Sequence, residues 1–306
     1  MIPKASLICV GLVGRRVADL TPAMRRKVEA YARRLAALSK RNAKIRRRDV
    51  VKIHSLFSSF RNRAVAAIPV RYSMNATSIA QILSSVAVEL DRLAVEYRVI
   101  FRGGVMSQAD LVAEALELYG QQFLPLGSQA PAVGLRAVAV QSAAQFSADL
   151  IGLTRGGLAA RMLGEVNRVL RLSALGAGPN AFNAAVEINT ALLGPGSGWS
   201  WQAERIYRTE VLRIHSLLMD SSVRELNARR PTAKVWIWSG ISRIEHSKVD
   251  RQVISVDGAY LVPLRSGGSV RMRFPRDPSA PPDATINCGC TEGPVPAEAA
   301  DSFLAA

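Results

Sequence analysis

Two cysteines one residue apart, in the stretch INCGCTE at residues 286–292, are the first candidates for chemistry in this chain of 306 residues. A disulfide between Cys288 and Cys290 would close a strained ring, and a redox pair normally has two intervening residues, so neither role is favoured. Thiolates are preferred zinc ligands, and a C-x-C turn can provide two of the four that a zinc ion usually takes. Two small thiols buried in a tight turn around Gly289 remain the alternative.

His246, in the segment SRIEHSKVD, is the best candidate for a third metal ligand. Asp250 follows four residues later and would share its face if this segment were helical, which makes it a weaker candidate. The chain has three histidines, and His215 is the local candidate for a further ligand. The sequence therefore requires no cofactor, and zinc is the metal that these residues would suit.

The same side chains could instead form a hydrolytic site, either metal-dependent or cysteine-dependent, in a hydrolase or nuclease domain at the C-terminus. A cysteine nucleophile needs a base within hydrogen-bonding reach, and His246 could be that base, with Glu210 and Asp250 as acidic partners. The sequence shows no group that would orient the base, no second cluster of histidine and acid, and no nuclease spacing. We therefore expect a protein without enzymatic activity and keep the hydrolase as the alternative.

The elements that must position these residues begin with long helices. Thr21 and Pro22 are typical of a helix N-cap and first helical position. Apolar residues then recur at spacings of four and three, which predicts a helix with one buried stripe, at Met24, Val28, Tyr31, Leu35 and Leu38. Further helices are predicted from Ser78 to about Tyr97, from Ser107 onward, and over residues 135–153, 157–172, 181–193 and 199–227.

From Lys234 the pattern changes to short strands. The apolar run KVWIWSGI at 234–241 predicts a buried strand, the Asp-Gly pair at 257–258 predicts a hairpin turn, and SVRMRF at 269–274 alternates as a half-buried strand does. The fold class expected is α+β, with a mostly helical N-terminal body and a small C-terminal module that contains a β-hairpin. The segments expected are a basic helical region at 1–150, a helical region at 151–233, the strand-containing module at 234–292 and a tail at 293–306.

Positive charge is concentrated near the N-terminus. The whole chain has a net charge of +16, and residues 1–70 hold 17 lysines and arginines against three acidic residues. Such a block attracts polyanions, most often nucleic acid, and the scarcity of aromatic residues favours contact with duplex phosphates over base stacking. A solvated helix face is the alternative. The residues expected to contact DNA without sequence preference are Lys40, Arg41, Lys44, Arg46, Arg47, Arg48 and Lys52.

The sequence gives no sign of a membrane span or a secretory signal. No apolar run approaches the ~20 residues that cross a bilayer. The N-terminal stretch MIPKASLICVGLVGRR has its positive charges mostly after the apolar patch, so a signal peptide is not expected. With three cysteines in the chain, a disulfide scaffold is not expected either. We expect the protein to be synthesised in the cytoplasm.

Five short motifs follow one another over residues 205–292: RIYRTEV, a tryptophan strand, an R-x-x-H segment, FPRDP and INCGC. This order resembles the phage head morphogenesis family, the Mu F-like minor head proteins, from about residue 150 onward. Two positions depart from the family pattern, because Arg251 stands where glycine is usual and Gly289 where arginine is usual. The matching residues are Arg208, Thr209, Glu210, Trp236, Arg243, His246, Pro275, Asp277, Pro278, Asn287, Cys288 and Cys290.

The resemblance implies a non-catalytic minor capsid protein that is made in the host cytoplasm and then packaged in the interior of the virion head. It implies portal and capsid or scaffold proteins as partners, a role in procapsid assembly at or near the portal vertex, and a role in DNA packaging or delivery. Residues 1–150 resemble no family, so their expected role rests on charge and helical pattern alone.

Overall fold

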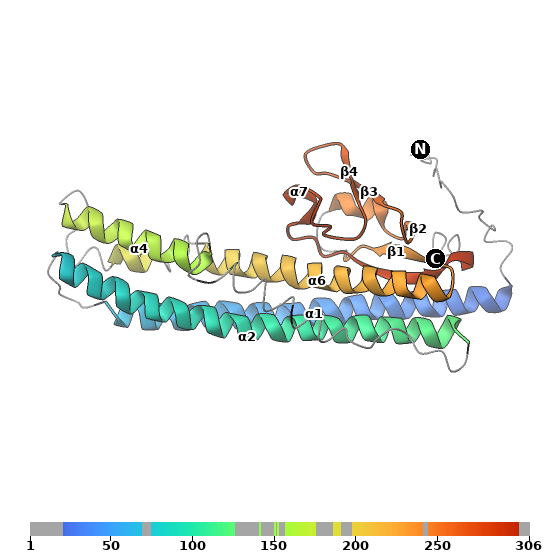
Figure 1. The fold of residues 1–306 in the computed structure, drawn as a ribbon, viewed down its shortest axis with the longest axis horizontal. Helices are drawn as coiled ribbons and strands as arrows, with labels where there is room; N and C mark the ends of the chain where they lie inside the picture. The colour runs from blue at the N-terminus through green and yellow to red at the C-terminus, as the bar shows by residue number, and fades with distance from the viewer. Residues whose placement is uncertain are drawn as a thin grey trace. The chain divides into compact units, whose positions relative to one another are not determined.

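The chain is mostly helical, with short antiparallel strands towards its C-terminal end (Figure 1), which confirms the predicted α+β class. Within the part of the chain that the structure describes, no helix has both the length and the apolar character needed to cross a membrane. The computed structural model describes residues 21–68, 75–125, 157–175, 186–190, 198–240 and 244–299, together with positions 141, 150 and 152.

The chain divides into two compact units, and each unit draws on separate stretches of sequence. The first comprises Met1–Ala43, Gln108–Arg136 and Leu212–Ala306, and the second comprises Lys44–Ser107 and Ala137–Val211. The sequence analysis expected contiguous segments at 1–150, 151–233, 234–292 and 293–306, and these bounds stay predictions.

Three long helices supply residues to both units: α1 (Pro22–Ala66), α2 (Ala76–Phe123) and α6 (Trp199–Arg229). Helix α1 begins as predicted, because the backbone N–H of Met24 donates to Thr21 Oγ1 at 3.2 Å. Helix α6 confirms the long helix predicted from residue 199.

The predicted helix start at Ser107 is wrong, because α2 is continuous through that position. The Ser107 hydroxyl donates to the carbonyl of Gly103 in the preceding turn at 3.0 Å and caps nothing. A glycine inside a helix costs only about 1 kcal/mol relative to alanine, which the buried residues on either side outweigh. The cap of α2 is Asn75, whose Oδ1 accepts the backbone N–H of Ser78 at 2.8 Å.

In the first unit, the helical core is built around aromatic rings from α1 and α2. The ring centroids of Tyr31 and Phe123 are 5.3 Å apart, and those of Tyr119 and Phe123 are 5.4 Å apart. Nearby, Asn42 and Gln108 are buried and exchange two side-chain hydrogen bonds of 2.9 and 3.1 Å. This reciprocal pair satisfies two buried amides and fixes α1 against α2 within this unit.

In the second unit, buried tyrosines connect the three long helices. Tyr207 on α6 donates to Asp49 Oδ2 on α1 at 2.6 Å, and Tyr97 on α2 donates to the carbonyl of Ala203 at 2.8 Å. The same unit contains α4 (Leu158–Ala174), which confirms the helix predicted over 157–172. The predicted helices at 135–153 and 181–193 lie largely outside the described residues.

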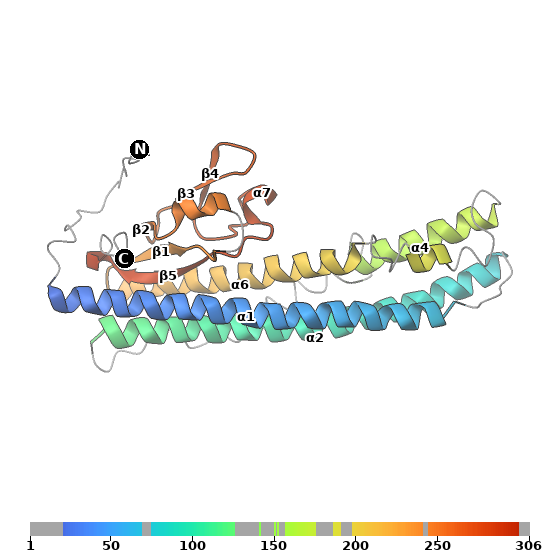
Figure 2. The same ribbon diagram turned by 180° about the vertical axis from the view of Figure 1, so that it is seen from behind.

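The C-terminal part of the first unit holds a three-stranded antiparallel sheet with the strand order β2-β1-β5 (Figure 2). Strand β1 (Thr232–Ile237) is central, and it pairs with β2 (Val253–Ser255) on one side and β5 (Thr291–Pro296) on the other. The buried strand predicted in KVWIWSGI is thus β1.

A second antiparallel pair joins β3 (Tyr260–Pro263) to β4 (Ser269–Met272). The hairpin predicted at the Asp-Gly pair 257–258 is wrong, because β2 on one side of that pair bonds to β1 while β3 on the other side bonds to β4. The hairpin turn is at 264–268, where two consecutive glycines take φ values of 96° and 76° that favour glycine.

The sheet packs against the helices of its own unit. Strand β5 runs so close to α1 that a Cβ on Gly293 would lie 3.1 Å from Leu35 Cδ1. The module's own core is a cluster of buried residues: Trp236, Val249, Tyr260, Val262, Met272, Ala280, Ala284, Cys288 and Cys290. Three short helices complete it: η2 (Ile244–Val249), α7 (Pro282–Thr285) and η3 (Ala297–Ala299).

Candidate metal centre

The structure brings together His246, Cys288 and Cys290, the three residues that the sequence suggested as metal ligands. His246 Nδ1 lies 3.4 Å from Cys288 Sγ and 3.7 Å from Cys290 Sγ, and all three candidate ligand atoms lie within 4.8 Å of one another. All three residues are buried, since His246 and Cys288 are each 1% exposed and Cys290 is 0% exposed. Both cysteines are free thiols, so no disulfide forms between them.

The short helix η2 places His246. Within this 3₁₀ helix, the Ser247 hydroxyl donates a hydrogen bond to the carbonyl of Ile244 at 2.6 Å. The His246 ring meets the Trp236 ring edge to face, with centroids 5.9 Å apart and an interplanar angle of 81°. Packing against a central strand therefore holds the imidazole in one orientation.

The two thiols lie on a turn that connects α7 to β5. The backbone N–H of Cys288 donates to the carbonyl of Thr285 at 3.2 Å, and Asn287 takes a φ of 57°. Asparagine tolerates this left-handed conformation better than most residues, which gives Asn287 a local reason for its place in the motif. The turn points both sulfur atoms towards the same imidazole nitrogen.

Arg276 holds this turn in place, although it was not among the residues expected at the site. Its side chain is fully buried, and Nη1 donates to the carbonyls of Cys288 and Cys290 at 2.9 and 2.6 Å. Nη2 donates to the carbonyl of Leu212 and to Ser216 Oγ on α6 at 2.8 and 2.7 Å. Burial lowers the pKa of this guanidinium, and the nearby thiols oppose that effect. Arginines are usually solvated, so only the fixed place of FPRDP in the motif order could have indicated this residue.

Asp277, the next residue, organises the loop that carries Arg276. Its Oδ2 accepts the backbone N–H of Arg273 at 2.9 Å, and its Oδ1 accepts the N–H and hydroxyl of Ser279 at 3.0 and 2.7 Å. Burial alone would raise the pKa of Asp277, but these hydrogen bonds outweigh it and hold the pKa below its usual value. The flanking motif residues differ in exposure, since Pro275 is buried and Pro278 is exposed.

The two thiols share one environment but differ in acidity. A hydrogen bond from Cys290, followed by the effects of His246 and Arg276, lowers the pKa of Cys288 despite its burial. Burial, followed by the neighbouring Cys288, raises the pKa of Cys290, and the indole of Trp236 acts in the opposite direction. The environment therefore makes Cys288 the more acidic of the two thiols.

Asp250 does not join the cluster. Its Oδ1 accepts the backbone N–H of Trp238 at 2.8 Å, and its Oδ2 lies 3.9 Å from Arg251 Nε. In a 3₁₀ helix, which has about three residues per turn, the fourth residue along is turned away from the first, so the shared face expected with His246 is not formed. Arg251, at the position where the resembling family has glycine, takes a φ of 61°, the left-handed conformation that glycine favours.

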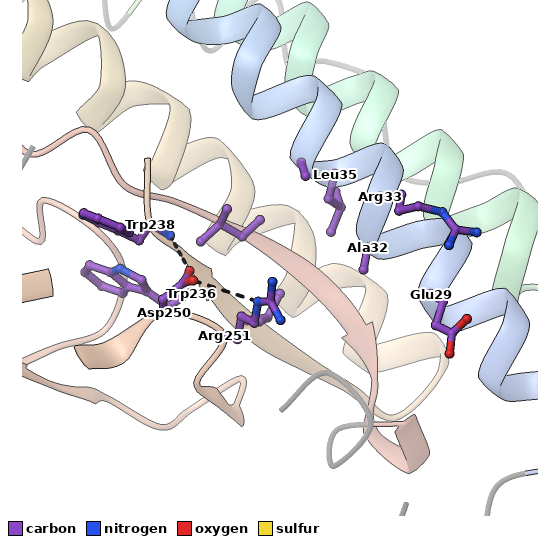
Figure 3. A pocket seen from close by; sticks show the side chains of 11 residues that line it. Glu29, Ala32, Arg33, Leu35, Trp236, Trp238, Asp250 and Arg251 are labelled. Atoms are coloured by element: carbon purple, nitrogen blue, oxygen red, sulfur yellow. Dashed lines mark hydrogen bonds and ion pairs between the residues drawn. The ribbon is translucent and has the colours of Figure 1, made fainter. Parts of the chain in front are cut away.

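Asp250 and Arg251 instead line an open groove of about 490 Å³ between β1 and α1 (Figure 3). Trp236 and Trp238 form the strand side of this groove, and Arg33 lies on the helix side. The three clustered ligands are not among its lining residues.

The remaining motif residues on α6 belong to the second unit. Arg208 Nη2 pairs with Glu204 Oε1 one turn earlier at 2.6 Å, while Thr209 and Glu210 are buried. Arg243 lies outside the described residues. In the Arg-Thr-Glu motif, Thr209 and Glu210 therefore belong to the buried side of α6, and Arg208 belongs to a local ion pair.

Two of the predicted DNA-contact residues lie in the α1 stretch of the first unit. Lys40 is exposed and has no ion pair with a described residue. Arg41 pairs with Glu114 on α2 through its two terminal guanidinium nitrogens, and Nη1 lies 3.1 Å from Oε1 of the carboxylate. Its charge is therefore already partnered.

The other five lie in the α1 stretch of the second unit. The carboxylate of Asp49 forms ion pairs with the Lys52 ammonium at 3.1 Å and with Arg48 Nε at 3.5 Å. The side chain of Arg46 is half-buried. The two that are exposed and have no ion pair with a described residue are Lys44 and Arg47.

Glu292 is another buried ionisable residue that no sequence pattern indicated. It is 2% exposed, and neither carboxylate oxygen has a hydrogen-bond partner among the described residues. Burial raises its pKa, against the effect of the Lys234 ammonium. It lines a small cavity of about 20 Å³ together with His215, which is outside the metal group.

Comparisons of the chain with protein-family models, with curated proteins and with solved structures found no match. The resemblance to the phage head morphogenesis family therefore rests on the order of motifs over residues 205–292 alone.

Proposed function

We propose that this protein is a non-catalytic minor head protein of a phage or prophage, acting in procapsid assembly at or near the portal vertex. The observation that carries the non-catalytic part is the burial of the chemically capable motif residues. His246, Cys288 and Cys290 are at most 1% exposed. A catalytic group must touch its substrate, so side chains this enclosed are better suited to holding the module together.

The proposal includes sequence-independent contact with double-stranded DNA through α1, and portal and capsid or scaffold proteins as further partners. Lys44 and Arg47 support the DNA contact, because they are exposed and lie three residues apart on one helix face without an ion pair to a described residue. The protein would then act in the host cytoplasm during assembly and afterwards inside the virion head, with a role in DNA packaging or delivery.

The location is tested by fractionating lysate of the encoding phage or induced prophage on a density gradient. Mass spectrometry of the procapsid and mature-head fractions is expected to detect the protein in a few copies per particle. Its absence from both fractions, while the portal protein is present, would contradict the proposal.

The DNA contact is tested by a double variant, Lys44→Glu with Arg47→Glu, in a duplex-binding titration at several salt concentrations. The slope of log K against log salt is expected to become shallower by about 0.9 for each phosphate that the variant no longer neutralises. The matched control is Arg98→Glu with Arg102→Glu, an equal charge change at two exposed residues of α2 in the same unit. An equal weakening in both variants would mean that total charge, and not α1, governs binding.

The alternative is a metal-dependent or cysteine-dependent hydrolase or nuclease. One observation favours it: the cluster offers three protein ligands, and catalytic zinc sites typically have three ligands and one open position. A plasmid-nicking assay separates the two functions. Nicking that a chelator abolishes, and that Cys288→Ser also abolishes, would support the nuclease, whereas no nicking supports the structural role.

A further inference from the structure

We propose that His246, Cys288 and Cys290 bind one zinc ion, which fastens the C-terminal module of the first unit. This assignment goes beyond the proposed function, because a head protein, a nuclease or a protein of another class could carry such a site.

The first argument is geometric. A zinc ion about 2.3 Å from a sulfur and about 2.0 Å from a nitrogen, at a tetrahedral angle, places these two atoms about 3.5 Å apart. His246 Nδ1 lies 3.4 Å from Cys288 Sγ and 3.7 Å from Cys290 Sγ. The two distances lie on either side of the expected value. The side chains could therefore coordinate an ion with little movement.

The second argument is the chemistry of the donor set. One imidazole and two thiolates are ligands for zinc and other thiophilic metals, and they exclude magnesium and calcium, which take oxygen ligands. Among the described residues, this is the one group of three or more histidine, cysteine or acidic side chains whose arrangement could hold a metal ion.

The third argument comes from the groups around the ligands. The buried indole N–H of Trp236 interacts with the sulfur of Cys290, although not in normal hydrogen-bond geometry. A metal-bound thiolate stays deprotonated, so a zinc–thiolate bond at Cys290 would keep a charged acceptor beside this N–H. Arg276 binds the carbonyls of both cysteines, so the backbone that carries the two thiols is held in place.

No further histidine, cysteine or acidic side chain of the described residues joins the three. The described residues thus supply three of the four ligands that a zinc ion usually takes. A thiol–imidazole hydrogen bond would explain the same distances without a metal, which is the competing explanation that the experiment must exclude.

The ion would connect two segments that are distant in sequence. His246 belongs to η2, Cys288 and Cys290 precede β5, and Arg276 connects the cysteine turn to α6. Because the ligands come together only in the folded module, metal binding and folding of the module are coupled.

The experiment measures zinc in the full chain, purified from zinc-containing medium without an affinity metal column. Elemental analysis of the wild type is expected to give about one zinc per chain. Cys288→Ser, Cys290→Ser and His246→Ala are each expected to lose most of it. The matched controls, Cys9→Ser and His54→Ala, make the same chemical changes elsewhere in the chain and should keep the zinc.

Because ligand variants can fail to fold, a second measurement uses the wild type alone. A mercurial reagent that reacts with thiols should release zinc to a colorimetric chelator in step with the reaction of two cysteines. Cobalt added to chelator-treated protein should give a thiolate charge-transfer band in the near ultraviolet and visible bands of a tetrahedral site. Wild-type protein with less than about a tenth of a zinc per chain and no cobalt–thiolate band overturns the proposal. Equal zinc loss in Cys9→Ser and Cys288→Ser also overturns it.

Discussion

Lys234 on β1 is fully buried, and its ammonium lies 2.9 Å from Asp220 Oδ1 on α6. The same ammonium donates to the carbonyl of Arg273 at 2.5 Å. One cation thus joins the central strand, a helix and the loop before Arg276 within the first unit. A buried charge is tolerated only with such partners, so this contact makes the placement of β1 on α6 specific.

Replacing Asp220 by alanine should strongly destabilise the protein, because Lys234 would remain buried without its counter-charge. A loss of about 3–5 kcal/mol in the free energy of unfolding is expected from breaking one side of a buried pair. Urea denaturation followed by circular dichroism measures it. The control is Glu225→Ala, which breaks the exposed pair with Arg229 on the same helix and should change stability by less than about 1 kcal/mol. Similar losses in the two variants would contradict the role given to the buried pair.

Arg276→Leu tests the buried arginine that holds the cysteine turn. The leucine removes the Arg276 donor from two carbonyls of the turn, from the Leu212 carbonyl and from Ser216 Oγ, and each buried acceptor left unsatisfied costs about 1–3 kcal/mol. We expect loss of the cooperative unfolding transition of the first unit. Arg271→Leu removes an exposed arginine from β4 and should leave the transition in place. A folded Arg276→Leu protein would show that the turn does not depend on this side chain.

The two consecutive glycines of α2 should respond in opposite ways to alanine. A Cβ on Gly103 would have open space around it, whereas one on Gly104 would lie 2.9 Å from the Tyr207 ring carbons within the second unit. Gly103→Ala is therefore expected to stabilise the helix by about 1 kcal/mol. Gly104→Ala is expected to destabilise the protein by about 1–3 kcal/mol through overpacking. Thermal denaturation of both variants checks this, and equal shifts would contradict the close approach of Tyr207.

Asp277→Asn should show a pH-dependent loss of stability. The pKa of Asp277 lies below its unfolded value, so its contribution is present above that value and disappears as the pH falls through the folded pKa. The difference in unfolding free energy between wild type and variant should therefore be largest near about pH 7 and shrink below about pH 4. Asp283→Asn, at a half-buried carboxylate bonded to Ser266, is the comparison. A difference that does not change with pH would contradict the ionised role.

Periodicity was sufficient to predict the helical part of the fold. The cap at Thr21 and the long helix from residue 199 could be read from the sequence, because local preferences and one apolar face decide them. The continuity of α2 through Ser107 could not, since it depends on packing partners distant in sequence.

Strand pairing was harder to predict. The Asp-Gly pair at 257–258 has the composition of a hairpin turn, yet β2 pairs with β1 instead. Turn chemistry is local, whereas the choice of partner strand depends on which edge of the sheet is free.

The candidate metal ligands could be found by residue type alone, but their support could not. Cysteine and histidine are rare in this chain, so His246 and Cys288 stand out in the sequence. Arg276 does not, because 40 lysines and arginines give no sign of which one is buried. Side-chain burial is a property of the folded chain, and no local pattern reports it.

The position of β1 between β2 and β5 has a consequence for synthesis on the ribosome. Strand β1 ends at Ile237, but its partner β5 begins only at Thr291. Until that later stretch leaves the exit tunnel, one edge of β1 stays unpaired and Trp236 lacks its final neighbours. The nascent chain therefore carries an open, apolar strand edge for the whole of that interval, and this is when chaperone protection would matter most.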